Sequence, residues 1–228
     1  MLKSSFENKN FWIFDLDNTI YDPKSKIFDQ IDLRMKKFIS SRLNITQEKA
    51  FKIQKKFYKE YGTTLSGLMK HYQIQPDEFL KFVHDVDLSK LKKCSNLFNE
   101  IKQLPGRKII YTNGDQDYAK KVLDSLGVES LFYYILDITK SKYIPKPSVE
   151  PLIAYLKKNK IKTKTCVYFE DLEKNLENAH KYGITTVHIM DQNIKKLNQP
   201  FIDYRFKSIL DALHTINKTY NKVGIWKK

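Results

Sequence analysis

The stretch that decides the fold is Phe11-Trp-Ile-Phe-Asp-Leu-Asp-Asn-Thr-Ile-Tyr21. It begins as an apolar run and ends in two carboxylates, Asp15 and Asp17. A short apolar run of this kind is typical of a strand that is buried on both faces. In an open α/β sheet, ligands bind just beyond the carboxyl ends of the parallel strands. The stretch therefore predicts a strand that delivers two acids to a ligand site.

A second segment, residues 107–114, repeats this pattern with different polar groups. Its apolar part ends in Thr112, Asn113 and Gly114, and a helical pattern follows. The Thr112 hydroxyl and the backbone N–H groups of the next two residues can point at an anion near a helix start. We expect Thr112 and Asn113 to bind phosphate.

Two further clusters follow along the chain. Lys146 precedes Pro147 at what the apolar spacing predicts to be the start of a helix. A lysine ammonium is a compact charge that suits a phosphate oxygen. Residues 165–171 read as another buried strand, and it ends in Glu170 and Asp171. Together with the first two segments, these clusters predict a single site.

Such a site would bring four carboxylates, those of Asp15, Asp17, Glu170 and Asp171, to within a few ångströms of one another. Each pair of like charges would then cost about 4 kcal/mol at an effective dielectric constant near 20. A cation makes the arrangement tolerable. Because the ligands are few and all hard oxygens, with room left for water and a phosphate, they favour Mg²⁺ over Ca²⁺.

These four segments resemble the four motifs of the haloacid dehalogenase (HAD) superfamily of aspartyl-phosphate phosphotransferases. Within it, residues 14–21, 61–68 and 82–88 resemble bacterial pyrimidine 5′-nucleotidase-like phosphatases, and the similarity spans nearly the whole chain. The resemblance implies a Mg²⁺-dependent phosphomonoesterase for a small phosphorylated metabolite. Pyrimidine nucleoside 5′-monophosphates are the leading substrates.

The resemblance also implies a role for each residue of the site. Asp15 would be the nucleophile, and Asp17 would act as acid and then as base. Mg²⁺ would be held by the Asp15 carboxylate, the Asp17 backbone carbonyl and the Asp171 carboxylate, with Glu170 beside them or on a metal-bound water. Thr112, Asn113 and Lys146 would hold the phosphoryl group.

Several alternatives remain. Dehalogenases of the superfamily lack the second acid of the first motif and need no metal, so Asp17 and Asp171 count against that chemistry. A phosphatase or phosphomutase for sugar or other organic phosphates would use the same residues. A non-catalytic basic binding protein on the same fold is the rival from another class, and the complete set of motifs counts against it.

The alternation of strands and helices predicts an α/β fold with a doubly wound parallel sheet, and the resemblance implies that this is a Rossmann-like HAD core. Residues 22–92 show no strand pattern and place apolar residues three and four apart, which predicts an inserted α-helical cap. The core would comprise residues 1–21 and 93–228. Within the cap we expect helices at 64–72 and 76–83 and an N-cap at Thr46.

Two groups of cap residues are candidates for contact with the substrate. Thr63 and Thr64 lie in a turn, where they either contact the substrate or cap a helix. His84, Asp85 and Asp87 lie near the return to the core, and we expect hinge or surface hydrogen bonding from them rather than catalysis.

The core pattern continues with strands at 131–138 and 184–189. Apolar residues from Phe206 to Ile216 predict a final amphipathic helix. The tail from 217 to 228 is polar enough that we expect it to be mobile.

Length and composition agree with one enzyme domain that carries an insert. The 228 residues can bury a sizeable core, and no apolar run approaches the ~20 residues of a membrane span. Lys and Arg outnumber Asp and Glu by 41 to 26, but they are scattered as on solvated helix faces, so a nucleic-acid partner is not expected. The N-terminus lacks a signal-peptide pattern, and Cys94 and Cys166 are unpatterned, which favours a cytoplasmic protein with reduced thiols. The oligomeric state is not predicted.

Overall fold

The computed structural model describes residues 6–190 and 199–221. A sheet of six strands forms the centre, and every neighbouring pair is parallel. The spatial order is β3-β2-β1-β4-β5-β6. The strands are β1 (Phe11–Phe14), β2 (Arg107–Tyr111), β3 (Tyr134–Leu136), β4 (Cys166–Glu170), β5 (Thr185–Ile189) and β6 (Tyr204–Phe206). This is the doubly wound α/β fold that the sequence predicts.

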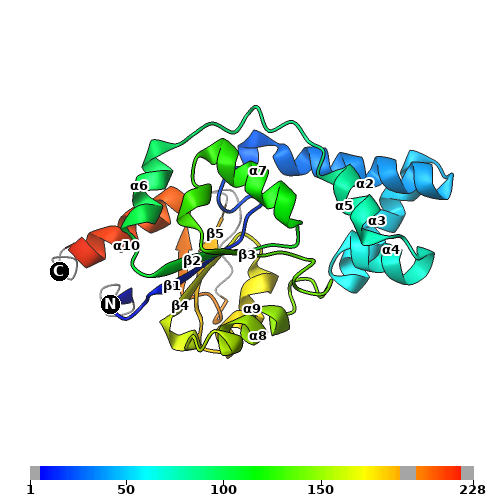
Figure 1. Ribbon diagram of the computed structural model, residues 1–228. Coiled ribbons are helices and arrows are strands. Elements are labelled where there is room, and N and C mark those ends of the chain that lie inside the picture. Colours follow the sequence, from blue (N-terminus) through cyan, green and yellow to red (C-terminus); the bar gives the residue numbers. More distant parts are fainter. Residues whose placement is uncertain (1–5, 191–198, 222–228) are drawn as a thin grey trace.

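Helices cover both faces of the sheet, which explains why β1 is apolar throughout. Trp12 and Phe14 belong to the hydrophobic cluster on the side of α6, α7 and α10, whereas Phe11 and Ile13 belong to the cluster on the side of α8 and α9 (Figure 1). Successive side chains of a strand point to opposite faces. The helices are α6 (Ser95–Gln103), α7 (Gln116–Leu126), α8 (Glu150–Lys158), α9 (Glu173–Lys181) and α10 (Ile209–Asn221).

The strand order reverses at β1, and this reversal positions the site. Phe14 pairs with Ile110 of β2 on one side and with Phe169 of β4 on the other. In such sheets the crevice beyond the carboxyl ends at the reversal point is where ligands bind. Asp15 directly follows β1, and Glu170 is the last residue of β4, so both lie at this edge of the sheet.

Four helices separate β1 from α6 along the chain. They are α2 (Ile27–Leu43), α3 (Gln47–Tyr61), α4 (Thr64–Tyr72) and α5 (Pro76–Val83). They lie together at one side of the sheet domain (Figure 1). The helices predicted at 64–72 and 76–83 are confirmed, and Thr46 caps α3 by accepting a hydrogen bond from the Lys49 N–H at 3.3 Å. We propose that residues 22–92 form an inserted cap and that residues 1–21 and 93–228 form the core.

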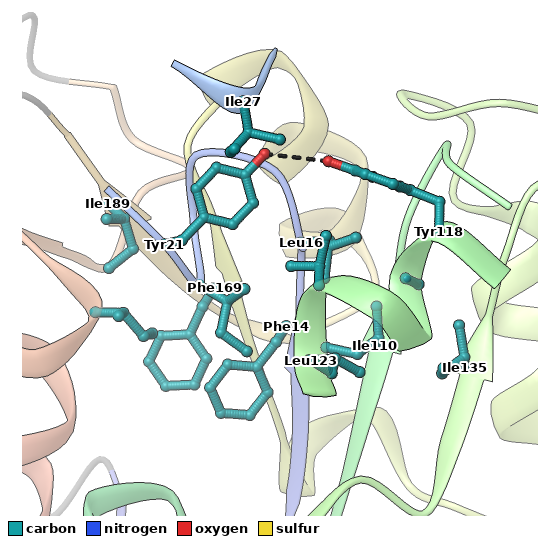
Figure 2. Close-up of a cluster of buried hydrophobic side chains, with 14 of the residues drawn as sticks. Phe14, Leu16, Tyr21, Ile27, Ile110, Tyr118, Leu123, Ile135, Phe169 and Ile189 are labelled. Atoms are coloured by element: carbon teal, nitrogen blue, oxygen red, sulfur yellow. Dashed lines mark hydrogen bonds between the residues drawn. The ribbon is translucent and has the colours of Figure 1, made fainter. Parts of the chain in front are cut away.

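The start of the cap is anchored in the hydrophobic interior of the core. Tyr21 and Ile27 lie in the same cluster of buried side chains as Phe14 and Phe169 (Figure 2). Ile27 has no exposed surface. The first cap helix therefore begins at a fixed point next to the end of β1.

The strand predicted at 131–138 is shorter than expected. Glu129–Leu131 form a 3-10 turn, and only Tyr134–Leu136 pair with β2. The Asp137 carboxylate ends the strand, because it accepts hydrogen bonds from the N–H groups of Gln116 and Lys140, each at 3.1 Å.

The predicted final helix was wrong at its start. Phe206 ends strand β6, where it pairs with Ile189, and the helix runs over Ile209–Asn221. Residues 217–221 of the expected mobile tail are helical, since Asn217 donates to the Glu100 carbonyl at 2.9 Å and Tyr220 is buried. Residues 222–228 lie outside the described part of the chain.

Within residues 6–190 and 199–221, none of the helices has both the length and the apolar character that crossing a bilayer requires.

Candidate active site

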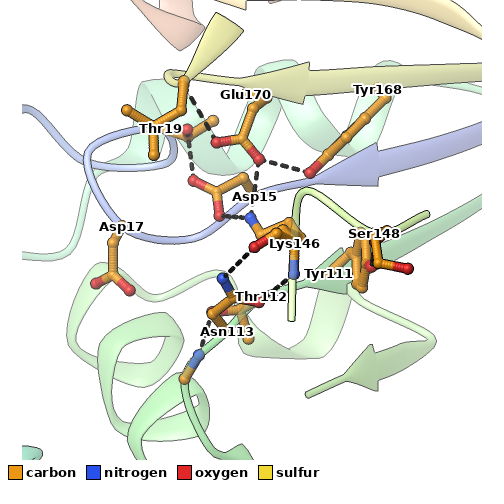
Figure 3. A network of polar contacts seen from close by, with 12 residues as sticks. Asp15, Asp17, Thr19, Tyr111, Thr112, Asn113, Lys146, Ser148, Tyr168 and Glu170 are labelled. Atoms are coloured by element: carbon orange, nitrogen blue, oxygen red, sulfur yellow. Dashed lines mark hydrogen bonds and ion pairs between the residues drawn. The ribbon is translucent and has the colours of Figure 1, made fainter. Parts of the chain in front are cut away.

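Asp15 lies at the centre of a buried polar network (Figure 3). Its backbone N–H continues the β1–β4 ladder by donating to the Phe169 carbonyl at 2.9 Å. Its Oδ2 accepts a hydrogen bond from Thr19 Oγ1 at 2.7 Å, and its Oδ1 lies 2.5 Å from Lys146 Nζ. The residue is 4% exposed. The carboxylate is therefore held in one orientation at the end of the strand.

Lys146 bridges the acids of two strands. Its ammonium bonds Asp15 and also Glu170 Oε2, the latter at 2.8 Å. Burial alone would lower the pKa of Lys146, but the two carboxylates together raise it above its ordinary value. The side chain is thus held as a positive charge between the two carboxylates.

The sequence prediction that Lys146 opens a helix was wrong, because α8 begins at Glu150. Lys146 lies in the preceding loop, in a cis peptide with Pro147. The Asn113 side chain holds this loop: its Oδ1 accepts from the Lys146 N–H at 2.9 Å and its Nδ2 donates to the Lys146 carbonyl at 3.4 Å. The Asn113 amide thus positions Lys146, a contact that the sequence did not indicate.

Both carboxylate oxygens of Glu170, at the end of β4, accept hydrogen bonds. Its Oε2 accepts from Tyr168 Oη at 2.5 Å as well as from Lys146, and its Oε1 accepts from the Leu172 N–H at 3.2 Å. Burial would raise the pKa of Glu170, but the Lys146 charge and these donors lower it overall. Glu170 is therefore ionised and acts as the counter-charge of the lysine.

The geometry of Asp15, Glu170 and Asp171 fits a divalent cation. One carboxylate oxygen from each of the three lies within 4.8 Å of the others. Burial and the neighbouring carboxylates raise the pKa of Asp15 to about 7 and that of Asp171 to about 10. In the absence of a cation the cluster is thus short of positive charge, and an oxygen-only donor set of this size is the kind that Mg²⁺ prefers.

Asp17 is held apart from this cluster by two tyrosines. Tyr21 and Tyr118 each donate a hydrogen bond to Asp17 Oδ1, both at 2.6 Å, and their hydroxyls lie 3.4 Å from each other (Figure 2). Burial, followed by the Asp17 charge, raises the pKa of both phenols far above the ordinary value, so each stays a donor. Figure 3 shows the Asp17 carboxylate outside the Asp15–Lys146–Glu170 network.

Sequence reasoning missed both tyrosines. Tyr21 closes the decisive stretch, four residues after Asp17, and that spacing was an available signal. Tyr118 lies 101 residues away from Asp17 on the buried face of α7, where an aromatic residue reads as packing. Only the fold brings it to the acid.

Thr112 shapes the turn after β2. Its backbone N–H donates to the Leu136 carbonyl at 3.1 Å, and its Oγ1 accepts from the Gly114 N–H at 2.9 Å. The hydroxyl hydrogen remains available to a ligand. Thr112 is 1% exposed, so that ligand has to reach it from within the site.

A cavity of about 340 Å³ joins these residues to the cap. This volume is within the ~300–1,000 Å³ range of small-molecule sites. All nine site residues of the sequence prediction line it, namely Asp15, Asp17, Thr63, Thr64, Thr112, Asn113, Lys146, Glu170 and Asp171. The structure thus brings the predicted residues together, and their chemical roles stay predictions.

The cap residues of the prediction also have structural duties. Thr63 is the N-cap of α4 and accepts from the Ser66 N–H at 3.1 Å, and Thr64 Oγ1 donates to the Gln54 carbonyl at 3.3 Å. Both also line the cavity, and their contact with a substrate stays a prediction.

The residues after α5 divide between surface and site. Hydrogen bonding at the surface is confirmed for Asp85, which pairs with Arg34 at 2.8 Å, and for Asp87, which accepts from the Ser89 N–H at 2.8 Å. His84, by contrast, lines the cavity, bonds Asp115 through Nδ1 and stacks on Tyr118 with ring centroids 4.4 Å apart. It supports one of the two tyrosines that hold Asp17.

Comparisons with known proteins agree with this geometry. Phosphate metabolism protein 8 of Saccharomyces cerevisiae is 24% identical over an alignment of 203 positions that covers 80% of this chain. The match spans 62% of the length of that yeast protein. Glyceraldehyde 3-phosphate phosphatase of Methanocaldococcus jannaschii is 26% identical over an alignment of 228 positions that covers 90% of this chain and 95% of the relative.

A similar fold is found in the crystal structure of a HAD phosphatase from Thermococcus onnurineus. The TM-score is 0.64 at 18% identity, with 91% of this chain and 97% of the other covered. The family model for haloacid dehalogenase-like hydrolases matches residues 12–189, a range that begins in β1 and ends with β5. The chain therefore belongs to the haloacid dehalogenase-like hydrolases, a family of enzymes.

Proposed function

We propose that this protein is a Mg²⁺-dependent phosphomonoesterase that works through an aspartyl-phosphate on Asp15. The observation that carries the proposal is the pairing of two acids in different environments. Asp15 is buried against Lys146 at 2.5 Å, whereas Asp17, two residues later, is held separately by two tyrosine hydroxyls. Two acids in distinct environments can take distinct roles, one as nucleophile and one as proton donor.

In the first step Asp15 attacks phosphorus, and the bond from phosphorus to the leaving alkoxide breaks. Asp17 gives its proton to that alkoxide. In the second step Asp17 accepts a proton from water, which attacks the aspartyl-phosphate and releases inorganic phosphate. Splitting the hydrolysis in this way replaces one difficult displacement with two easier ones.

Lys146 supplies positive charge to the transferring phosphoryl group. Thr112 and the turn after it supply hydrogen bonds to its oxygens. Mg²⁺, when bound, supplies further charge stabilisation at the phosphoryl oxygens. The Asp15 and Asp171 carboxylates and the Asp17 backbone carbonyl would hold it, with Glu170 alongside. The grouping of Asp15, Glu170 and Asp171 oxygens supports this assignment.

For the substrate, we propose a small phosphate ester, with pyrimidine nucleoside 5′-monophosphates as the leading candidates. The apolar and aromatic wall that the cap gives the cavity supports them, since Phe28, Tyr58 and Phe79 line it. Glyceraldehyde 3-phosphate is the second candidate, because the relative that matches along 95% of its length is named for that substrate.

The test is release of phosphate from a panel of UMP, CMP, dTMP, AMP, GMP, glyceraldehyde 3-phosphate and sugar phosphates, with Mg²⁺ and with a chelator. We expect chelator-sensitive release that favours UMP or CMP, and loss of at least about a thousandfold in Asp15→Asn. Release from glyceraldehyde 3-phosphate alone would keep the mechanism and replace the substrate. Equal rates with chelator, or full activity in Asp15→Asn, would contradict the proposal.

A further inference from the structure

A glutamine of the cap lies on the cavity with its amide orientation fixed. Gln54, on α3, is 1% exposed and lines the cavity. Its Nε2 donates to Asp32 Oδ1 at 2.8 Å and to the Asp32 backbone carbonyl at 3.2 Å. An ionised carboxylate and a carbonyl only accept hydrogen bonds, so the nitrogen of the amide has to face Asp32. The oxygen, Oε1, is turned away.

Gln54 Oε1 is a buried acceptor with no hydrogen-bond partner among the described residues. Leaving a buried carbonyl unpaired costs free energy, and native proteins rarely tolerate it without a purpose. Most of the other unpaired buried side-chain atoms lie on residues outside the cavity. Among the residues that the structure describes, Asn175, on the core side, is the other one that is both in that group and on the cavity wall.

The surroundings of Gln54 restrict which hydrogen-bond donors can pair with its Oε1 atom. Its neighbour Lys55, the nearest cation in the sequence, is already paired with Asp32 Oδ1 at 2.6 Å. The rest of the cap wall combines apolar side chains, those of Phe28, Ile31, Met35, Leu65, Phe79 and Leu80, with polar ones, those of Asp32, Lys55, Tyr58, Thr63, Thr64 and His84. The faces of a flat ring can pack on the apolar side chains, while an N–H at its edge supplies the donor that Gln54 Oε1 lacks.

We propose that Gln54 Oε1 accepts a hydrogen bond from an N–H on the leaving group, and that this contact selects nucleoside monophosphates whose base presents such a donor over those whose base lacks it. Asp32 is the positioning residue, because it fixes which end of the amide faces the ligand. The inference rests on the phosphatase activity proposed above and assigns the specificity of the same cavity.

The test compares UMP with its N3-methyl derivative, in which the ring N–H is replaced. In the wild type we expect kcat/KM for UMP to exceed that for the methylated compound by at least about tenfold. In Gln54→Met, which keeps length but loses the acceptor, the ratio should fall to about one. Asp32→Asn, which lets the amide turn over, should lower the ratio partway.

Gln75→Met is the matched control, since Gln75 is an exposed glutamine of the cap with no side-chain hydrogen bond at the start of α5. We expect it to keep the wild-type ratio. A ratio near one in the wild type, or a wild-type ratio that Gln54→Met leaves unchanged, would overturn the inference.

Binding separates this inference from the proposed function. The dissociation constants of UMP and N3-methyl-UMP are measured by calorimetry with Asp15→Asn and with Asp15→Asn/Gln54→Met. Discrimination that depends on Gln54 would uphold the inference even if no substrate were turned over. Turnover of glyceraldehyde 3-phosphate without binding of UMP would uphold the phosphatase and overturn the role of Gln54.

Discussion

At the scale of single residues, the hydroxyls of Tyr21 and Tyr118 both bind Asp17 Oδ1, so in the proposed mechanism Oδ2 would be the oxygen that transfers the proton. Without them the carboxylate would be free to rotate. We predict that Tyr118→Phe lowers kcat for an alkyl phosphate by about tenfold, because the proton donor is then poorly aligned. For p-nitrophenyl phosphate, whose leaving group needs no proton, kcat should change by less than about twofold.

Tyr134→Phe is the control for this variant, since Tyr134 is on the edge strand β3 and does not line the cavity. It should leave both rates at the wild-type level. An equal loss on the two substrates in Tyr118→Phe would show that the tyrosine serves stability or binding instead of Asp17.

The metal cluster predicts a pH-dependent response to Mg²⁺. The pKa values of Asp15 and Asp171, about 7 and about 10, lie above the ordinary value of 3.8, so the folded protein binds more protons than the unfolded chain. Stability of the metal-free protein therefore falls as pH rises from about 4 through these values. Because a cation binds the ionised acids, we expect Mg²⁺ to raise Tm more at pH 9 than at pH 5.

Scanning calorimetry with chelator and with Mg²⁺ checks this at both pH values. In Asp171→Asn the Mg²⁺-dependent gain at pH 9 should be largely lost. A gain in Tm that is the same at both pH values would contradict the assignment of these acids to the metal.

At the scale of helices and strands, the sequence predicted those elements whose pattern is local. β1 was readable because its four residues fill two buried faces, and α4 and α5 were readable from spacing and from a proline at the first turn. β6 was not predicted, since its three half-buried residues come just before α10 and their apolar side chains continue the apolar pattern of that helix. The Asn113–Lys146 and Tyr118–Asp17 contacts could not be predicted from the sequence, because they join residues that are distant along the chain and that only the fold brings together.

Two cap helices pack so closely that a glycine is required. A Cβ built on Gly67 of α4 would lie 2.2 Å from Phe57 Cγ of α3. We predict that Gly67→Ala lowers the free energy of unfolding by about 1–3 kcal/mol through overpacking, as measured by urea denaturation. Combined with Phe57→Ala, which removes the Cγ and Cδ2 atoms that a Cβ at position 67 would meet, it should cost less than the sum of the single changes. Strict additivity would show that the two helices do not meet there.

At the scale of the whole molecule, cap and core meet across the cavity. Lys174 Nζ, on α9 of the core, lies 4.0 Å from the ring centroid of Tyr58, on α3 of the cap. Tyr58 also lines the cavity. A cation–π contact at an exposed site contributes about 0.5–1 kcal/mol. This contact therefore favours the arrangement in which the cap covers the acids.

We predict that Lys174→Gln raises KM by about two- to fivefold while Tm stays within about 1 °C of the wild type, because the cap then closes less often. Steady-state kinetics and thermal denaturation check the two quantities. Lys181→Gln is the control, as Lys181 lies on the same helix and pairs with Glu177 on the outer surface. A rise in KM of the same size in Lys181→Gln would point to general charge loss instead.

The central claim is that Asp15 carries the phosphoryl group between substrate and water. The most direct measurement is acid quenching of the Mg²⁺-loaded enzyme within one turnover of a radiolabelled phosphate ester, followed by peptide mapping. We expect radiolabel on the peptide that contains Asp15 in the wild type, and no labelled peptide in Asp15→Asn. Phosphate release at full rate with no labelled protein at any quench time would contradict it.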